Sequence, residues 1–317
     1  MNDIRRTILW VIFGFSMVLL WDKWQLHNGN KATFFPSPAA VGAAAPAAGA
    51  SAPLAGAASV PASTAPAVAS IGASAVPGTP APAAPAAREK IEVTTDVYRL
   101  TFDGEGGSLT HAELLKHADM TDKAKNFVLF DESTQRVYVA QTGLIGGSFP
   151  THKTVMTALP GPLALKDGEN ELTIRFESPE QGGVKLVKTW TLKRGAYDIA
   201  VKHEVVNVGS TAVSPQLYLQ LVRDGNKPPG ESSFYSTFTG PAVYTDAKKY
   251  QKIEFKDIEN GKVDIPKESP NGYVAMVQHY FASAWLLADG VQRELFTRKV
   301  SDNLYSVGMI TPLGNID

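Results

Sequence analysis

The sequence contains no cysteine, and this absence excludes disulfide bonds, thiolate zinc sites and cysteine nucleophiles. A cysteine-free chain suits an oxidising compartment such as a periplasm, where a stray thiol would react. Any excess of basic charge is also lacking, since 30 Lys and Arg stand against 31 Asp and Glu, for a formal net charge of −1. Because nucleic-acid binding needs a basic surface, we expect no nucleic-acid partner. The folded part must be stabilised by its own hydrophobic core.

Catalytic sequence motifs are absent as well. The chain contains neither the H-E-x-x-H pattern of zinc proteases nor the G-x-S-x-G pattern of serine hydrolases. Gly104-Glu105-Gly106-Gly107 lacks the lysine and the following helix of a P-loop, so we interpret it as a glycine turn, and Gly143–Gly147 as a loop. Ser232-Ser233 has no base nearby in the sequence. We therefore predict no catalytic, cofactor-binding or metal-binding residues, and a protein that is not an enzyme.

The remaining polar residues have structural interpretations beside functional ones. His111, Glu113 and His117 form a small cluster in the sequence, a weak candidate for metal or acid–base chemistry. His203 falls on the apolar-facing register of a predicted strand, which favours a core histidine over a ligand. Asp257 with Glu259 is typical of a surface pair, although a sugar-processing pair of carboxylates stays open, because sequence spacing does not determine spatial distance. Four aromatic residues are candidates for lining a cleft, but we predict that they belong to the core: Tyr98, Trp190, Tyr218 and Trp285.

The first apolar segment of the chain predicts a membrane anchor. Arg5 and Arg6 precede an uncharged run, Thr7–Trp21, which ends in bulky aromatic residues instead of the small-residue cleavage site of a signal peptide. The run is shorter than the roughly 20 residues that span a bilayer, but its tryptophans suit the interfacial region. We expect residues 1–27 to form a retained transmembrane helix with a cytoplasmic N-terminus, since flanking basic residues stay on that side.

A segment of different composition follows the anchor. Between Pro36 and Ala87 there is no charged residue, and Ala, Pro, Gly and Ser account for almost all positions. Such a segment has few large side chains to bury, and its prolines interrupt helices, so we predict a disordered linker over residues 28–88. A flexible chain of this length reaches about 40 Å on average. The segment then acts as a tether or as a simple spacer.

Residues 89–317 predict a mainly β domain. Tyr273–Leu287 is ambiguous by periodicity, and its aromatic and β-branched residues favour two strands with an irregularity near Gln278-His279. Short helices are predicted at Leu109–His117 and Asp246–Tyr250. Many short strands separated by Gly and Pro turns are typical of a large antiparallel β-sandwich. The strands are expected at residues 97–102, 127–130, 136–140, 172–176, 184–192, 197–206, 216–222 and 304–310.

Several blocks of this sequence resemble the YidC/Oxa/Alb family of membrane protein insertases. The resemblance begins with the basic-flanked first helix and the low-complexity spacer, and it covers nearly all of the exported region in the family's order. It is similar to the family's N-terminal portion, with the first membrane helix and the periplasmic domain. The matching blocks are Val93–Leu109, Phe127–Phe130, Tyr138–Leu144, Lys188–Tyr197, Thr239–Tyr244, Lys249-Tyr250 before Phe255, and Gly272–Trp285.

The resemblance implies an inner-membrane insertase and chaperone. Such proteins help nascent inner-membrane proteins to insert, fold and assemble, alone or with the Sec translocon, without nucleotide hydrolysis or cofactors. The implied periplasmic fold is a β-supersandwich, similar in topology to sugar mutarotases. The family's insertion groove and its arginine lie in a C-terminal bundle of five helices that also meets the ribosome. Arg5, Arg6 and Arg88 do not substitute for that arginine, and we expect a fragment, cut short at the C-terminal end of its periplasmic domain.

Two other functions stay open at this point. A single-span periplasmic adaptor or binding domain, similar in layout to TonB-type proteins, has the same arrangement of one helix and a Pro-rich tether. A carbohydrate-binding or mutarotase-like domain is the third hypothesis, with His111 and His203 as the residues to test.

Overall fold

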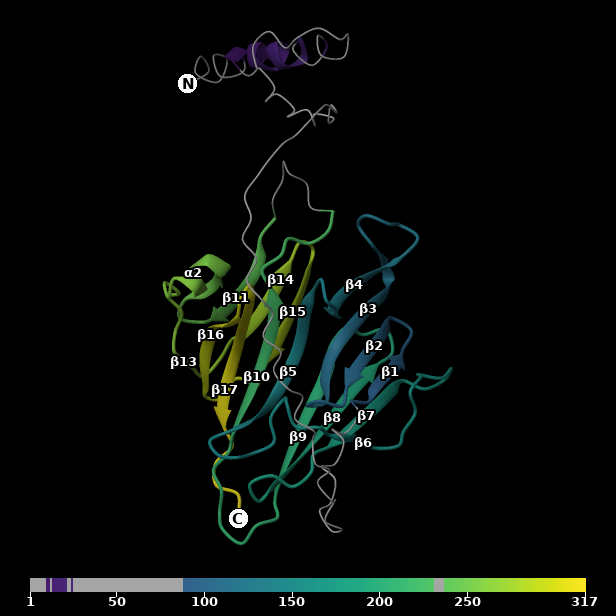
Figure 1. Ribbon diagram of the computed structural model, residues 1–317, viewed down its shortest axis with the longest axis vertical. Helices are drawn as coiled ribbons and strands as arrows, with labels where there is room; N and C mark the ends of the chain where they lie inside the picture. The colour runs from purple at the N-terminus through teal and green to yellow at the C-terminus, as the bar shows by residue number, and fades with distance from the viewer. Residues whose placement is uncertain (1–9, 12, 22–23, 25–87, 231–236) are drawn as a thin grey trace, which may run out of the picture. The chain divides into compact units, whose positions relative to one another are not determined.

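The computed structural model describes residues 10, 11, 13–21, 24, 88–230 and 237–317 (Figure 1). The predicted linker lies outside the described residues except for Arg88, as does Ser232-Ser233. The chain divides into two units, Met1–Val76 and Pro77–Asp317. The described residues of the first unit are helical and expose large apolar side chains, among them Trp10 (72%) and Leu20 (70%). Within the described residues, no helix combines the length and apolar character needed to cross a membrane.

The second unit is built almost wholly from antiparallel strands, which confirms the predicted mainly β fold. One short helix, α2 (Phe255–Glu259), is present among its described residues. The strands are β1 (Lys90–Thr94), β2 (Tyr98–Asp103), β3 (Ser108–Ala118), β4 (Asn126–Glu132), β5 (Val137–Ile145), β6 (Thr157–Ala158), β7 (Glu171–Glu177), β8 (Val184–Lys193), β9 (Ile199–Asn207), β10 (Gln216–Asp224), β11 (Thr239–Thr245), β12 (Lys249–Lys252), β13 (Glu268–Ser269), β14 (Tyr273–Gln278), β15 (Phe281–Leu286), β16 (Arg293–Ser301) and β17 (Leu304–Pro312).

Three sheets form the sandwich. The largest has nine strands in the order β1-β2-β3-β4-β5-β10-β17-β16-β13, and the two smaller sheets have the orders β12-β11-β14-β15 and β6-β7-β8-β9. Both smaller sheets pack against the large one. Phe102 on β2 lies against Trp190 on β8, with ring centroids 5.1 Å apart, while the indole of Trp285 on β15 donates a hydrogen bond to the Gln220 carbonyl on β10. The core therefore lies between the large sheet and the two smaller ones.

The predicted hairpins are confirmed. β8 pairs with β9 through the turn at Lys193–Ala196, where Gly195 has φ 72°, and buried and half-buried residues alternate along most of β8. The ambiguous segment Tyr273–Leu287 is indeed two strands, β14 and β15, and the irregularity is the tight turn between them, with His279 at φ 53°. Burial alternates with period two along most of β8 and along β15, because one face of each strand is buried. β14 is buried along most of its length, and its β-branched and aromatic residues favoured a strand.

Three predicted elements are wrong. Leu109–His117 is not a helix but most of strand β3, in which an extra residue between Leu109 and His111 shifts the register against β2. This bulge lets Leu109, Ala112 and Leu114 all face the core, and the three-residue step from Leu109 to Ala112 imitates a helix. Asp246–Tyr250 is not a helical turn either; it contains the turn from β11 to β12, where Lys249 has φ 56°.

The third error concerns Gly143–Gly147, because Gly143 lies within β5 and only its neighbours beyond Ile145 leave the strand. A Cβ at Gly143 would lie 2.5 Å from Tyr218 Oη and 2.9 Å from the His152 amide nitrogen. Glycine is therefore required here for a close approach between segments and not for a turn.

Candidate functional site

A groove crosses the face of the large sheet that points away from the two smaller sheets. Along β5, Tyr138 and Thr142 face the smaller sheets, where they bond Met276 on β14 and His203 on β9, so Val139 and Gln141 face the opposite side. Two adjoining cavities, of about 680 Å³ and about 140 Å³, lie there and share four lining residues: Glu132, Gln141, His152 and Lys153. We call the two cavities together the outer groove.

Polar groups line the smaller cavity at one end of the outer groove. Asp103 is buried and accepts the backbone N–H of Glu105 at 2.7 Å, and Glu105 forms an ion pair with Arg88 at 2.8 Å. Ser108 is 3% exposed, and its hydroxyl has no hydrogen-bond partner among the described residues. Glu132 and Lys153 also line this end, so the groove begins as a polar recess with charged groups of both signs and hydroxyl groups.

The middle of the groove is held by neutral hydrogen bonds. The Gln220 amide on β10 donates to Gln141 Oε1 on β5 at 2.9 Å. The Tyr218 hydroxyl accepts the backbone N–H of His152 at 2.9 Å and also bonds the ring nitrogen Nδ1 of His152. Burial lowers the pKa of His152 to about 4 and raises the pKa of Tyr218 to about 12. Both side chains are therefore uncharged at neutral pH.

The far end of the groove is aliphatic. Val139 and Val222 lie side by side in the register of β5 and β10, and Ser306 of β17 follows in the same row. Phe296 from β16 packs onto Gly308, where a Cβ would clash with its ring, and the Arg298 guanidinium lies 5.4 Å from the ring centre of Phe296. The remaining apolar lining comes from Val137, Ile145, Val300, Leu304 and Ile310.

A second polar arrangement lies on the core side of the same strands. Lys188 on β8 is fully buried, and its ammonium group donates to the carbonyls of Gly106 at 2.6 Å and Thr142 at 2.7 Å. Burial without a carboxylate partner lowers its pKa to about 7. His203 Nε2 bonds Thr142 Oγ1 at 2.8 Å, and burial lowers the pKa of His203 to about 3. These contacts tie β8 and β9 to the large sheet.

His203 thus occupies the position expected of a core histidine with a satisfied side chain. The predicted core aromatics are also buried or half-buried, with Tyr98 at 8%, Tyr218 at 7% and Trp190 at 2% exposure. Tyr218 has a dual role, because its ring is buried while its hydroxyl reaches the wall of the outer groove.

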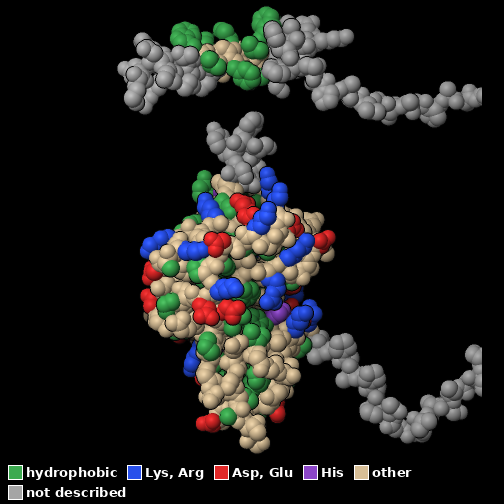
Figure 2. Space-filling model, turned by 90° about the vertical axis from the view of Figure 1, so that its left-hand side faces the viewer, with side chains coloured by type: hydrophobic (Ala, Val, Ile, Leu, Met, Phe, Trp, Pro, Cys, Tyr) green, Lys and Arg blue, Asp and Glu red, His purple; other side chains and the backbone are tan. Residues whose placement is uncertain are grey.

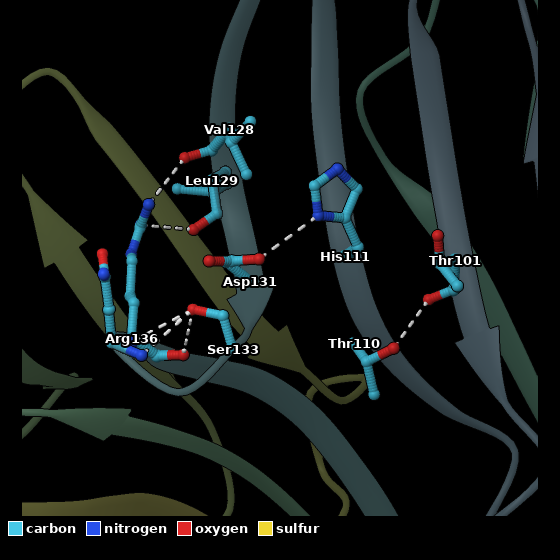
Figure 3. A network of polar contacts seen from close by, with 9 residues as sticks. Thr101, Thr110, His111, Val128, Leu129, Asp131, Ser133 and Arg136 are labelled. Atoms are coloured by element: carbon cyan, nitrogen blue, oxygen red, sulfur yellow. Dashed lines mark hydrogen bonds and ion pairs between the residues drawn. The ribbon is translucent and has the colours of Figure 1, made fainter. Parts of the chain in front are cut away.

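The cluster of His111, Glu113 and His117 does not form a common site. His111 Nδ1 lies 3.6 Å from Asp131 Oδ1, as Figure 3 shows. Glu113 instead accepts a hydrogen bond from Arg99 at 2.7 Å, and the His117 ring lies tilted against Tyr197 and edge-on to Phe281. In the described part of the chain, no group of three or more His, Cys, Asp or Glu side chains is placed to hold a metal ion.

Arg136 makes polar contacts with β4, the strand that also carries Asp131. Its guanidinium donates to the carbonyls of Val128 at 3.1 Å and Leu129 at 2.8 Å (Figure 3). It also donates to the side-chain oxygen of Gln278 on β14 at 3.3 Å. Burial lowers its pKa, although it stays charged. Arg136 is therefore a structural link between the large sheet and β14.

The pair Asp257 and Glu259 lies on α2, and Glu259 accepts hydrogen bonds from Tyr305 and Lys299. These hydrogen bonds lower the pKa of Glu259.

No sequence pattern points to the buried position of Lys188 or to the outer groove, since the contacts of Lys188 and the walls of the groove come from strands far apart in the chain. Charged side chains of both signs are interspersed over much of the domain face in Figure 2, in keeping with the net charge of −1.

The fold and the groove define this unit as an antiparallel β-sandwich with an open groove on its largest sheet. A family model described as the YidC periplasmic domain matches residues 90–317. Proteins named membrane protein insertase YidC match 99% of the chain: one from Janthinobacterium sp. (strain Marseille) is 46% identical, one from Herminiimonas arsenicoxydans 47%, and one from Cupriavidus necator 48%. The chain therefore belongs to the YidC family of membrane protein insertases, as the sequence resemblance indicated.

The matched part covers 55%, 54% and 55% of these three relatives, so the chain spans about half the length of the curated relatives it matches. Among solved structures, a galactose mutarotase related enzyme from Lactobacillus acidophilus superposes with a TM-score of 0.43 and 9% identity, covering 71% of this chain and 86% of that one. Membership of the family implies an inner-membrane protein with a periplasmic domain.

Proposed function

We propose that this chain forms the membrane anchor and periplasmic domain of an insertase that assists the insertion, folding and assembly of inner-membrane proteins, alone or with the Sec translocon. The observation that carries the proposal is the identity of 46–48% to insertases over nearly the whole chain. The clients are nascent inner-membrane proteins, the bilayer is a further contact, and ribosome contact belongs to the half of the relatives that this chain does not match. The role is non-enzymatic.

The proposed topology has three parts. Residues 1–27 cross the inner membrane with the N-terminus in the cytoplasm, residues 28–88 are a linker, and residues 89–317 lie in the periplasm. Arg5 and Arg6 support this orientation, because basic residues flanking a first helix stay cytoplasmic. The exposed tryptophans Trp10, Trp21 and Trp24 suit a membrane interface. Cysteine substitutions at Asn2 and Ser133, labelled from outside with a membrane-impermeant maleimide, test this: label at Ser133→Cys alone supports the proposed topology.

Complementation tests the function. In cells depleted of their own insertase, we expect this 317-residue polypeptide alone not to restore growth, and a fusion to the unmatched half of the Janthinobacterium relative to restore it. The fusion isolates what this chain contributes, because the same half expressed without it serves as the control. Full rescue by the 317 residues alone would place the activity in this chain and refute the assignment. Failure of the fusion, with normal membrane levels, would refute the family role.

A further inference from the structure

The outer face of the β14–β15 hairpin is apolar. Trp285 on β15 donates a hydrogen bond to the Gln220 carbonyl of the large sheet, so its neighbours Ala284 and Leu286 point the other way. On β14, Ala275 lies opposite Ala284 and points outward with it. The residues that point outward in this register are Tyr273, Ala275, Val277, Ala282, Ala284 and Leu286, and we call them the apolar face.

A hollow of about 380 Å³ lies over the apolar face. None of the described residues that line this hollow is Lys, Arg, Asp or Glu. Large side chains around it are open to solvent, with Tyr280 85% exposed, Leu286 68% and Tyr250 45%. The isolated domain therefore leaves a concave apolar surface in contact with water.

The sheet formed by β6–β9 shows what an exposed face in this domain ordinarily carries. Lys202 and Glu204 point outward from β9 and form an ion pair at 3.0 Å. Lys185 points outward from β8 and pairs with Glu177 at 3.2 Å. An antiparallel sheet with one solvated face alternates apolar and polar residues in this way. The apolar face departs from that pattern, and an exposed apolar patch marks an interaction site.

Tyrosines lie at both ends of the apolar face. At one end, Tyr250, Tyr244 and Tyr273 follow one another in register across β12, β11 and β14. The rings of Tyr244 and Tyr273 stack with their centroids 5.4 Å apart. At the other end, Tyr280 lies in the turn between β14 and β15. Tyrosine combines an apolar ring with a hydroxyl group, and it is enriched where proteins meet the interface between lipid and water.

A lysine borders the apolar face. Lys252 on β12 lies opposite Ala242 on β11, and Ala242 lies opposite Ala275, so Lys252 belongs to the same row across the sheet. Its ammonium group lies 5.2 Å from the ring centre of Phe238. A cation beside an apolar surface complements the negative charge of anionic phospholipids. The face and its border therefore match the chemistry of a bilayer surface.

We propose that the apolar face docks on the periplasmic surface of the inner membrane, with Tyr280 and Leu286 in the interface and Lys252 beside anionic headgroups. The proposal rests on the proposed topology, in which one chain joins the membrane anchor to the periplasmic domain. This connection raises the effective concentration of bilayer at the domain, so a modest apolar surface is enough for docking. A separate protein partner is recruited at its own concentration and lacks this advantage.

Docking in this way orients the domain. The apolar face lies on the side of the small sheet that points away from the large sheet, and the outer groove lies on the side of the large sheet that points away from the small ones. The docked domain therefore keeps the outer groove uncovered, on the side opposite to the membrane contact.

A fluorescent label in the apolar face tests this with the full chain in liposomes. The chain has no cysteine, so Ala284→Cys provides a single attachment site for the fluorophore NBD. Ala200→Cys is the matched control, because Ala200 is also an exposed alanine on a strand and belongs to the other small sheet. The liposomes contain phosphatidylethanolamine and phosphatidylglycerol, with or without nitroxide-labelled lipid. We expect the nitroxide to quench the label at position 284 and not the label at position 200.

Two substitutions test the chemistry of docking, read from the quenched fraction of the label at position 284. Leu286→Glu lowers the ratio of docked to undocked domain at least about tenfold, because burial of one leucine is worth about that factor or more. Val206→Glu is its control, because Val206 is 47% exposed and lies on β9, and we expect a change of less than about twofold. Lys252→Glu weakens docking, and weakens it less when phosphatidylcholine replaces phosphatidylglycerol, whereas Lys202→Glu on β9 has no effect. Thermal unfolding confirms that each variant is folded.

Equal quenching at positions 284 and 200, no quenching at either, or equal docking of the Leu286 and Val206 variants overturns the proposal. An interchain disulfide through unlabelled Ala284→Cys, without quenching, replaces it with an interface between two copies of the chain. Flotation of the liposomes on a density gradient separates docking from topology. If the chain floats with the liposomes and position 284 is not quenched, only the docking is refuted. If the chain does not float, the topology is refuted and the docking with it.

Discussion

Replacing Lys188 changes how the stability of the domain depends on pH. The folded pKa of Lys188 is about 7, against 10.5 for an exposed lysine, because the ammonium group is fully buried with two carbonyls and no carboxylate. Between these values the unfolded chain holds a proton that the folded chain has released. Stability therefore rises with pH in this window.

The size of the effect follows from proton linkage. At pH 7 the folded lysine is half protonated, and at pH 9 it is almost wholly neutral, while the unfolded lysine stays charged. The free energy of unfolding then rises by about 2 kcal/mol between pH 7 and pH 9 on account of this one group. Lys188→Met keeps an unbranched side chain only one atom shorter and removes its titration, so the variant lacks this rise. Its absolute stability also changes, because two buried carbonyls lose their donor.

Equilibrium urea unfolding at pH 7, 8 and 9 measures the effect. Tryptophan fluorescence reports on the domain through Trp190 and Trp285 once Trp10, Trp21 and Trp24 are changed to phenylalanine. Lys185→Met, on the same strand but paired with Glu177 at the surface, is the control and should follow the wild-type pH dependence. Parallel curves for the wild type and Lys188→Met would refute the reasoning, since they mean that Lys188 stays charged in its buried position.

Three further predictions follow from the same contacts. His203 has a folded pKa of about 3 against 6.5, so stability falls as the pH drops below 6.5; His203→Gln reduces that loss, measured as melting temperature from pH 7 to pH 4.5. Gly143→Ala forces a methyl group against Tyr218 and costs about 1–3 kcal/mol in urea unfolding, whereas Gly161→Ala costs less, because its Cβ makes only an ordinary contact at 3.8 Å with the Thr173 carbonyl. Arg136→Met leaves two backbone carbonyls without a donor and costs about 2 kcal/mol or more by the same measurement.

Each of these predictions has a result that contradicts it. If the melting temperature of His203→Gln falls between pH 7 and pH 4.5 as much as that of the wild type, groups other than His203 cause the loss of stability in acid. Equal stability of the two glycine variants means that Tyr218 moves aside freely. The control for Arg136→Met is Arg175→Met, because Arg175 is exposed. If Arg136→Met is as stable as the wild type, water replaces the guanidinium as hydrogen-bond donor with no loss in the free energy of unfolding.

Secondary structure was predictable wherever a strand had one buried face and no irregularity. The segment of β8 and β9 alternates regularly, and its turn is marked by Gly195, so the hairpin was predicted almost to the residue. β3 was missed because its bulge places apolar residues three apart, which is a helical spacing. A bulge depends on what the neighbouring strand does, and one sequence segment does not contain that information.

The site residues divide in the same way. His203 was correctly placed in the core, because its register is a local property of β9. The burial of Lys188 cannot be predicted from the sequence, because it depends on Gly106 and Thr142, which come from other parts of the chain. The outer groove could not be predicted either, since it exists only after β3, β5, β10, β16 and β17 have been brought together in one sheet.

By itself, the sequence determined the class of protein, because composition, strand periodicity and the ordered family blocks are all written in the linear chain. It also determined most strands and turns, since these depend on neighbouring residues. Only the tertiary structure decided which side chains meet. Burial of Lys188 and His203, the contact of Tyr218 with Gly143, and the shape of the outer groove arise from strand pairing over long sequence distances. Pairing of that kind depends on the whole core, and no single segment specifies it.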